Sequence, residues 1–336
     1  LGLGDSARLD DVIAFGPRDV WAVGSGPRVL HWDGHDWQEE KVPEIPSTDN
    51  SWWGRWRLVG SSPDDLWIHG ESRQLLRRTG GHWVAVPTVS ESVEPKLVQF
   101  SSGELWLFHD GVLRWDGLRF ERLDQDPQRG LKDLRYPRAV ARLGDGSVAA
   151  CSSEVYIVRD GKMVTTLPRP PVASCNAVAG SSAQDVWVLG TLPGELKHWD
   201  GAAWHHLDGH NYLRAVVSLG PGRAVVVGDR TERRLYLPNP VVTQADGTEQ
   251  RWQLALGKSR GATREVCTLG ARKLLSCFWD GAWHSEEIPE LRSGPLDFQA
   301  NDRGAMAILA GSRNFLLRGS TETAFREVKP PEGDWV

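Results

Sequence analysis

A tryptophan-centred pattern recurs along the whole chain at a nearly constant interval. The stretch "RDVWAVGSGPRVLHWDGHDW" at residues 18–37 is nearly repeated by "QDVWVLGTLPGELKHWDGAAW" at residues 184–204. Equivalent positions lie 38 to 46 residues apart, at Trp21, Trp67, Trp106, Ala149, Trp187, Val225, Cys267 and Ile308. A period of about 41 residues constrains the fold strongly, because each unit of such a repeat buries its apolar face by stacking on its neighbours.

Each unit consists of short alternating runs separated by Gly, Asp, Ser and Pro, which is the pattern of strands joined by tight turns. In the first unit we predict strands at 10–16, 19–24, 28–32 and 36–43. Four antiparallel strands per unit make the blade of a β-propeller. A helical solenoid would need stretches of ten or more residues with a 3.6-residue period, and the sequence breaks before that length.

Eight units fit the spacing within one domain, 1–336. They lie at approximately residues 8–43, 52–87, 95–124, 136–168, 175–208, 212–245, 250–289 and 295–329. We therefore predict an all-β fold, a β-propeller of eight four-stranded antiparallel blades. A seven-bladed alternative stays open, because residues 238–290 can be divided into strands in two ways. We expect the first blade to pack on the last, helped by the tail that ends at Trp335.

The repeated polar residues have local structural explanations. Four units carry Trp-Asp-Gly after the third strand, at residues 32–34, 115–117, 199–201 and 279–281. Asp bonds nearby backbone and Gly supplies a positive φ, so these are hairpin turns. A carboxylate recurs before the second strand at Asp19, Asp65, Glu104, Asp185 and Glu265. We expect it to cap the preceding turn or bond a neighbouring blade, since catalysis does not need one acid per blade.

The repeated aromatic residues fall into two sets. One set is central in the second strands, at Trp21, Trp67, Trp106 and Trp187. The other follows the hairpin turn, at Trp37, Trp83, Phe120, Trp204 and Trp283. We interpret both as packing between twisted sheets. The alternative is a set of sugar sites between blades, built from recurring aromatic residues as in propeller lectins.

The run D-V-W-x-V-G followed by H-W-D-G-x-x-W resembles the Trp-rich propeller repeats common in bacterial secreted proteins and lipoproteins, loosely similar to BNR, Kelch and tectonin-type propellers. The similarity is strongest in units one and five and weakest in units four, six, seven and eight. It implies a propeller for the whole chain and no single activity. The sialidase-type Asp-box, S-x-D-x-G-x-x-W, lacks its Ser-x-Asp half here, so that enzymatic function does not carry over.

The charge and hydropathy of the sequence restrict which kinds of partner the protein can have. The net charge of −5 and pI of about 6.1 supply no basic field for nucleic acid. No run of 18 apolar residues occurs, so we expect no membrane span in the chain as given. The chain begins "LGLGDS" without methionine, and we expect that a leader was removed and that the protein is secreted, periplasmic or lipid-anchored. We also expect a monomer.

The cysteine and histidine pattern predicts no cofactor. No C-x-x-C occurs and the ten histidines are scattered, so a zinc site has little support. In an exported protein the four cysteines permit two disulfides, and neighbouring strands favour Cys151 with Cys175 and Cys267 with Cys277. The alternative is that all four are small buried residues.

Departures from the repeat point to function, because binding residues in such scaffolds are carried by loops. The clearest departure is "NSWWGRWRLV" at 50–59, in the connection from blade one to blade two. The connections at 124–138, 208–214 and 228–234 should reach the same face, which also carries the loops between second and third strands. The candidate ligand-binding residues are Trp52, Trp53, Arg55, Trp56, Arg135, Tyr136, His210, Tyr212 and Arg230, with Arg129, Arg138 and Arg214 nearby.

This aromatic and cationic surface suits a glycan, an acidic ligand or a peptide, through stacking, cation–π contacts and bidentate arginine bonds. The alternative is that Trp52 and Trp53 plug the channel or cover the first blade. Three function classes stay open: a lectin-like binding module for a glycan, peptide or protein, an enzyme, and a scaffold subunit. The candidate catalytic residues would be His210, Asp229 and Arg230. The sequence leans against an enzyme, because it has no nucleophile elbow, P-loop, zincin motif or dinucleotide fingerprint.

Overall fold

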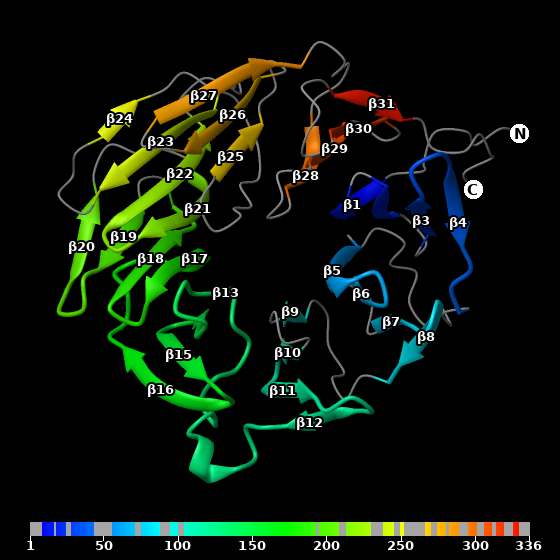
Figure 1. Ribbon diagram of the computed structural model, residues 1–336. Coiled ribbons are helices and arrows are strands. Elements are labelled where there is room, and N and C mark those ends of the chain that lie inside the picture. The colour runs from blue at the N-terminus through cyan, green and yellow to red at the C-terminus, as the bar shows by residue number, and fades with distance from the viewer. Residues whose placement is uncertain are drawn as a thin grey trace, which may run out of the picture. The chain divides into compact units, whose positions relative to one another are not determined.

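The structure of the chain, a computed structural model, consists of β-strands joined by turns, with one short helix in the described residues (Figure 1). It describes residues 9–16, 18–24, 28–43, 56–70, 75–87, 95–99, 104–192, 195–207, 213–229, 238–244, 249–251, 266–269, 274–279, 282–288, 295–300, 306–310, 314–318 and 325–328. Over these ranges the strands form eight antiparallel sheets, seven of four strands and one of three. The all-β prediction is confirmed.

The chain divides into two compact units. The first comprises residues 1–95, 99–104 and 288–336. Its first sheet contains β1 (Leu9–Gly16), β2 (Asp19–Gly24), β3 (Arg28–Trp32) and β4 (Trp37–Glu40). Its second contains β5 (Arg57–Ser62), β6 (Asp65–His69), β7 (Leu75–Thr79) and β8 (His82–Val86). Its third contains β28 (Pro295–Ala300), β29 (Met306–Ala310), β30 (Asn314–Arg318) and β31 (Arg326–Val328).

The second unit comprises residues 96–98 and 105–287. Its first sheet contains β9 (Lys96–Gln99), β10 (Leu105–Phe108), β11 (Val112–Trp115) and β12 (Phe120–Arg122); the last residue of β9, Gln99, is assigned to the first unit. Its second sheet contains β13 (Ala139–Arg142), β14 (Val148–Cys151), β15 (Val155–Arg159) and β16 (Lys162–Leu167). The 3-10 helix η1 (Pro127–Arg129) lies between these two sheets in the sequence. The next sheet contains β17 (Cys175–Ser182), β18 (Asp185–Gly190), β19 (Leu196–Trp199) and β20 (Trp204–Leu207). The last two contain β21 (Leu213–Gly220), β22 (Arg223–Asp229), β23 (Pro238–Gln244) and β24 (Glu249–Arg251), then β25 (Val266–Leu269), β26 (Leu274–Trp279) and β27 (Ala282–Glu287).

Within each sheet the strands follow one another in chain order, so every sheet is the meander predicted for a blade. In the first unit of the repeat, β1 to β4 confirm the four predicted strands. One boundary differs from the prediction. Residues 250 and 251 were assigned to the seventh unit, but Val241 pairs with Arg251 and Val242 with Gln250, so β24 completes the sixth sheet.

The sheets that contain the two ends of the described chain pack on each other. Strand β1 contacts β28 and β29, and Leu9 and Val12 share an apolar core with Ala307, Leu317 and Val328. The expected packing of the first blade on the last is confirmed. A contribution from Trp335 lies outside the described residues.

Successive sheets of the second unit also share cores. Ala149 and Ile157 pack with Val178 and Val186 between the sheets of β13–β16 and β17–β20. Backbone bonds join the same two sheets, since Gly144 N donates to Gly180 O at 3.1 Å and Asp145 N to Ser181 O at 2.8 Å. The interface therefore combines apolar burial with satisfied backbone groups.

The recurring carboxylates hold turns and neighbouring sheets together. In β18, Asp185 accepts bonds from Ser181 N at 3.1 Å and Ser181 Oγ at 2.6 Å, and also from Gly222 N of the next sheet at 2.9 Å. Its Oδ1 lies 2.7 Å from His198 Nε2, whose ring stacks on Trp187. Asp19, Trp21 and His31 repeat the arrangement of acid, indole and imidazole in the first sheet. The structural interpretation of these carboxylates is confirmed for Asp185.

The central tryptophans of the second strands are fully buried, with Trp21, Trp67 and Trp187 at 0% exposure and Trp106 at 1%. The Trp-Asp-Gly segments at 32–34, 115–117 and 199–201 form the predicted turns, and the segment at 279–281 lies partly outside the described residues. Asp116 Oδ1 accepts the backbone N–H of Leu118 and Arg119, and Gly117 has a φ of 108°. The N–H donors of Arg119 and Leu118 lower the pKa of Asp116 below its ordinary value. Asp33 and Asp200 make the same turn with their own following residues.

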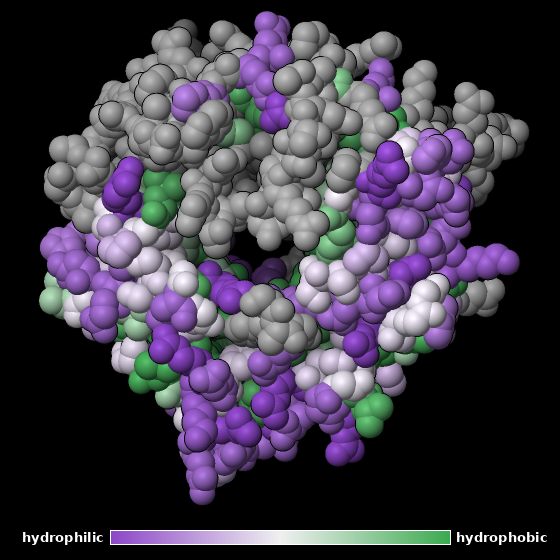
Figure 2. All heavy atoms as spheres, in the orientation of Figure 1, coloured by the Kyte–Doolittle hydropathy of each residue, from purple (hydrophilic) through white to green (hydrophobic). Residues whose placement is uncertain are grey.

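The described surface in the view of Figure 2 is mainly hydrophilic, with hydrophobic side chains scattered over it. The large apolar side chains exposed in the described ranges are Leu118, Tyr136, Val164 and Leu192. No helix of the described part of the chain is long and apolar enough to cross a membrane.

Candidate functional site

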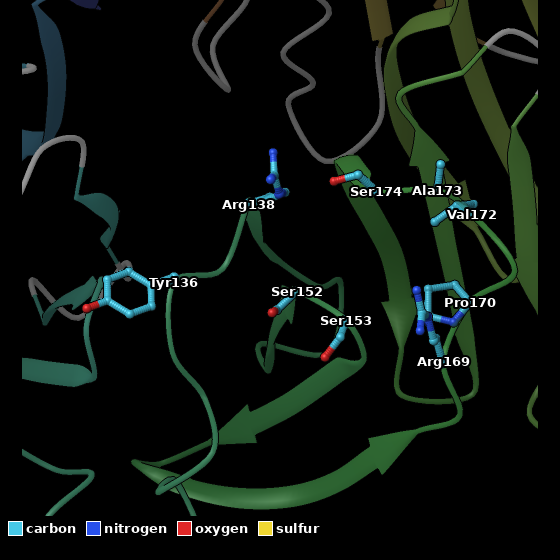
Figure 3. A pocket seen from close by; sticks show the side chains of 9 residues that line it. All are labelled: Tyr136, Arg138, Ser152, Ser153, Arg169, Pro170, Val172, Ala173 and Ser174. Atoms are coloured by element: carbon cyan, nitrogen blue, oxygen red, sulfur yellow. The ribbon is translucent and has the colours of Figure 1, made fainter.

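A pocket of about 260 Å³ opens at one end of the sheets β13–β16 and β17–β20 (Figure 3). Its walls come from the β12–β13 connection, the β14–β15 turn and the β16–β17 connection. It is lined by Tyr136, Arg138, Ser152, Ser153, Arg169, Pro170, Val172, Ala173 and Ser174. We call it the loop pocket. Connections between sheets and a turn between second and third strands meet here, as predicted for the long-loop face.

Covalent and hydrogen bonds fix the three walls relative to one another. Cys151, the last residue of β14, forms a disulfide with Cys175, the first residue of β17, with their Cα atoms 6.1 Å apart. Arg138 N donates to Cys151 O at 2.9 Å, which attaches the β12–β13 connection to the same point. Ser152 follows one cysteine and Ser174 precedes the other. The pocket is therefore built around a predicted disulfide that the structure confirms.

Two arginines give the loop pocket its charge. The side chains of Arg138 and Arg169 are exposed, and no hydrogen bond or ion pair joins either guanidinium to another side chain within the described residues. Other arginines of this unit are paired: Arg122 contacts Asp124 at 3.1 Å, and Arg159 contacts Asp145. The hydrogen bonds that Arg122 donates to Asp124 raise the pKa of Arg122. Since arginine stays charged at any physiological pH, the pocket carries two cations for which the described residues supply no counter-ion.

Hydroxyl groups lie between the two cations. Ser152 and Ser153 are in the β14–β15 turn, and Ser174 is at the end of the β16–β17 connection. In Figure 3 the hydroxyl of Ser174 points toward the side of the pocket that carries Arg138. The described lining contains no carboxylate, imidazole, amine or free thiol; its polar side chains are those of two arginines, three serines and Tyr136.

Tyr136 forms one edge of the pocket in an uncommon backbone conformation. Its φ is 48°, a left-handed value that bulky residues rarely adopt, and its side chain is 60% exposed. The buried residue His109 holds it there: Tyr136 N donates to His109 O, and the two rings meet edge to face with centroids 5.0 Å apart. Such local strain occurs at functional sites, where the surrounding structure enforces it.

The opposite wall comes from the β16–β17 connection, whose Pro170, Val172 and Ala173 form an apolar surface, the apolar wall, between Arg169 and Ser174. Glu195 connects this wall to the turn after β18. Its Oε1 accepts Ala173 N at 2.8 Å and its Oε2 accepts Leu192 N at 3.0 Å. Both backbones are thus bound to one carboxylate, which brings the backbone of Leu192, a residue with an exposed side chain, close to that of Ala173.

The candidate residues named from sequence fall into three groups. Tyr136 lines the pocket, and Arg135 lies beside it with its Nε donating to Lys132 O at 3.3 Å. Trp56 is buried at 8% exposure, and a Cβ on Gly70 would come within 2.9 Å of its ring, so this indole belongs to the core and offers no face to a ligand. The residues outside the described ranges are Trp52, Trp53, Arg55, His210, Tyr212 and Arg230. Asp229 ends β22.

Sequence reasoning missed Arg169, the serines and the apolar wall. The segment 168–174 is a short proline-rich connection, PRPPVAS, without the aromatic residues that marked most of the other candidate loops. The available signal was the predicted pairing of Cys151 with Cys175, which brings 152–153 and 174 together. No group of three or more His, Cys, Asp or Glu side chains within the described ranges could hold a metal ion.

Comparison with known proteins identifies the fold. No protein-family model matches the chain, and no curated protein is similar to it in sequence. Among solved structures, the computationally designed Ika8 protein is similar with a TM-score of 0.63 and 13% identity, covering 97% of this chain and 98% of that one. YCF48 bound to a D1 peptide gives a TM-score of 0.55 at 14% identity, covering 96% of each chain. A streptogramin B lyase gives 0.51 at 11% identity, covering 92% of each chain.

The structural class follows from these likenesses and from the meander sheets: the chain has a β-propeller fold. At these identities the likeness extends to the fold and not to any activity. The number of blades stays a prediction, as does the resemblance to Trp-rich, BNR and Kelch repeats. The predicted disulfide between Cys267 and Cys277 requires the two residues to lie close together, and the register of β25 and β26 sets them opposite each other.

Proposed function

We propose that this protein is a binding module and that the loop pocket receives an anionic group of its ligand. The observation that carries the proposal is the pair Arg138 and Arg169, two guanidinium groups to which no described residue supplies a counter-ion, in a pocket that also contains three serine hydroxyls. A guanidinium binds carboxylate and phosphate through parallel charge-assisted bonds, and each hydroxyl can add a donor.

Binding is better supported than catalysis. The described lining has no carboxylate, imidazole, amine or free thiol to move a proton at reacting atoms, whereas its two arginines are suited to hold an anion. A propeller can present a peptide site, since YCF48 was solved with a D1 peptide bound. Among the ligands considered from sequence, a peptide or protein with an accessible anionic group therefore fits this pocket.

The proposal includes export or surface attachment. Disulfides persist in oxidising compartments and are rare in the reducing cytosol. The bond between Cys151 and Cys175 supports the localisation proposed from the sequence.

A variant comparison tests the proposal. The purified chain is titrated with N-acetylglycine and, separately, with inorganic phosphate, and binding is followed by thermal shift. We expect saturable stabilisation in the wild type and its loss in Arg138→Gln/Arg169→Gln. Arg119→Gln is the matched control, because Arg119 is an exposed arginine of the same unit outside the pocket. Equal stabilisation of the double variant and the control would refute the anion site.

A further inference from the structure

We infer that the ligand group in the loop pocket is the C-terminal residue of a peptide, with its free carboxylate on the arginines and a small aliphatic side chain on the apolar wall. This inference rests on the proposed anion-binding function and specifies its ligand. It follows from the distribution of chemistry within the pocket, from the pocket's size and from the position of Leu192.

The two walls of the pocket differ in chemistry. Arg138 lies on the wall with Ser152, while Pro170, Val172 and Ala173 lie on the other wall, where Arg169 flanks Pro170 at one end (Figure 3). A peptide C-terminus carries a planar carboxylate and a side chain on the same carbon atom. It can therefore place a charge on one wall and an aliphatic group on the facing wall without an intervening spacer. A phosphorylated side chain or an acidic sugar has no aliphatic group next to its anion, so it would leave Val172 against polar atoms.

The volume limits what can enter. A space of about 260 Å³ corresponds to roughly nine water molecules at about 30 Å³ each. That number of heavy atoms is close to one amino-acid residue with its terminal carboxylate. Complete drug-sized ligands occupy pockets of roughly 300–1,000 Å³. The pocket therefore fits the end of a chain, whose remainder lies outside.

The charge preference favours a carboxylate. Guanidinium and carboxylate are both planar, and their paired bonds match in geometry. The exposed position of both arginines leaves their donor groups accessible to a ligand from solvent. Ser174, whose hydroxyl points toward the Arg138 side, supplies a further donor for the second carboxylate oxygen.

The surface next to the pocket provides a place for the preceding residue of the peptide. Leu192 is 55% exposed, and its backbone N–H is bound to the same carboxylate as that of Ala173 in the apolar wall. A peptide that leaves the pocket over this wall would cover Leu192 with its penultimate side chain. We therefore expect an aliphatic preference at the last position, set by Val172, and a weaker one at the penultimate position, set by Leu192.

The test uses fluorescein-labelled hexapeptide pools and fluorescence anisotropy. One pool has random aliphatic residues at its last two positions and a free C-terminus, and a second is identical but amidated. Two further amidated pools carry an internal glutamate or an internal phosphoserine, and a labelled glucuronic acid represents acidic glycans. We expect the free-acid pool to bind about tenfold or more tighter than its amide, since charge-assisted bonds to the terminus are lost on amidation.

Variants assign the binding to the pocket. Arg138→Gln/Arg169→Gln should abolish the preference for the free acid, and Arg119→Gln should keep it. Val172→Ser should weaken binding of the aliphatic pool while N-acetylglycine still binds. Leu192→Ser should act in the same direction and more weakly, which keeps the test valid if Val172→Ser fails to fold.

The outcomes separate this inference from the proposed function. Equal binding of the free-acid and amidated pools, or tighter binding of the internal glutamate, phosphoserine or glucuronic acid probe, would overturn the C-terminal inference. If N-acetylglycine still binds in an arginine-dependent way in that case, the anion site survives. If no anion binds, both fail.

Discussion

Cys151 and Cys175 join two adjacent sheets by a disulfide, and each cysteine is next in sequence to a serine that lines the loop pocket. The residues that follow one cysteine and precede the other supply hydroxyls to that pocket. The same bond therefore holds two sheets together and sets the distance between two walls of the candidate site.

Removing this disulfide should cost stability. The bond closes a loop with a sequence separation of 24 residues, and loop-closure entropy predicts a loss of about 3 kcal/mol in the free energy of unfolding. Urea denaturation of Cys151→Ala/Cys175→Ala measures it. Cys175→Ala alone should lose nearly the same amount, because either change breaks the bond. A loss below about 0.5 kcal/mol in both would contradict the loop-closure account.

Asp185 should stabilise the fold in a pH-dependent way. Burial alone would raise the pKa of Asp185. The hydrogen bonds with His198, Ser181 and Gly222 together lower it by more than burial raises it, so the folded-state pKa lies below the ordinary value. A carboxyl with a depressed pKa stabilises the fold above its unfolded-state pKa of about 3.9, and this contribution disappears as the pH falls through the folded-state pKa.

We expect Asp185→Asn to lose about 1–3 kcal/mol at neutral pH, because buried donors lose a charged acceptor. The difference from the wild type should shrink in the acid range below about pH 4. Thermal denaturation between pH 2 and 7 checks both statements. A difference that stays constant over that range would show that the charge of Asp185 does not contribute.

The Trp-Asp-Gly turn should require glycine for its backbone conformation alone. Gly117 has a φ of 108°, and a Cβ there would meet no atom within 4 Å. Gly117→Ala should therefore lose about 1–2 kcal/mol from backbone strain. Gly16 is the matched control, because it also has open space but an ordinary φ, and Gly16→Ala should be neutral or slightly stabilising. Equal effects of the two substitutions, measured by chemical denaturation, would refute the assignment.

Tyr136 should lower the stability of the fold and strengthen binding in the loop pocket. Its left-handed φ of 48° costs a bulky side chain about 1 kcal/mol, so Tyr136→Gly should leave the free energy of unfolding unchanged or raise it. The same variant should weaken binding in the loop pocket, because one edge of the site is removed. Denaturation and anisotropy on one protein sample measure the two effects. Lower stability with unchanged affinity would assign Tyr136 a purely structural role.

The sequence predicts local structure here better than it predicts the site. Strands β1 to β4 follow from alternation and turn residues, and the bonds of Asp185 follow from the recurrence of a carboxylate before the second strand. The strands and the bonds of Asp185 both depend on interactions within one repeat or between successive repeats. Such interactions recur at the same position of each unit, so the repeat period makes them recognisable in the sequence.

The site depends on side-chain direction, which composition does not encode. Trp56 lies in a conspicuous aromatic and basic segment, yet its ring packs against Gly70 in the core. Arg169 lies in an unremarkable connection, yet it reaches a pocket formed with residues from two other loops. Only the three-dimensional arrangement of the sheets distinguishes the two residues.

The most direct measurement of the anion site is NMR spectroscopy of the arginine Nε–H groups in isotope-labelled protein during titration with N-acetylglycine. We predict saturable shifts for Arg138 and Arg169, with Arg122 unchanged because Asp110 and Asp124 already occupy its guanidinium. Absence of shifts at Arg138 and Arg169, or equal shifts at all arginines, would contradict the assignment of the loop pocket as a binding site.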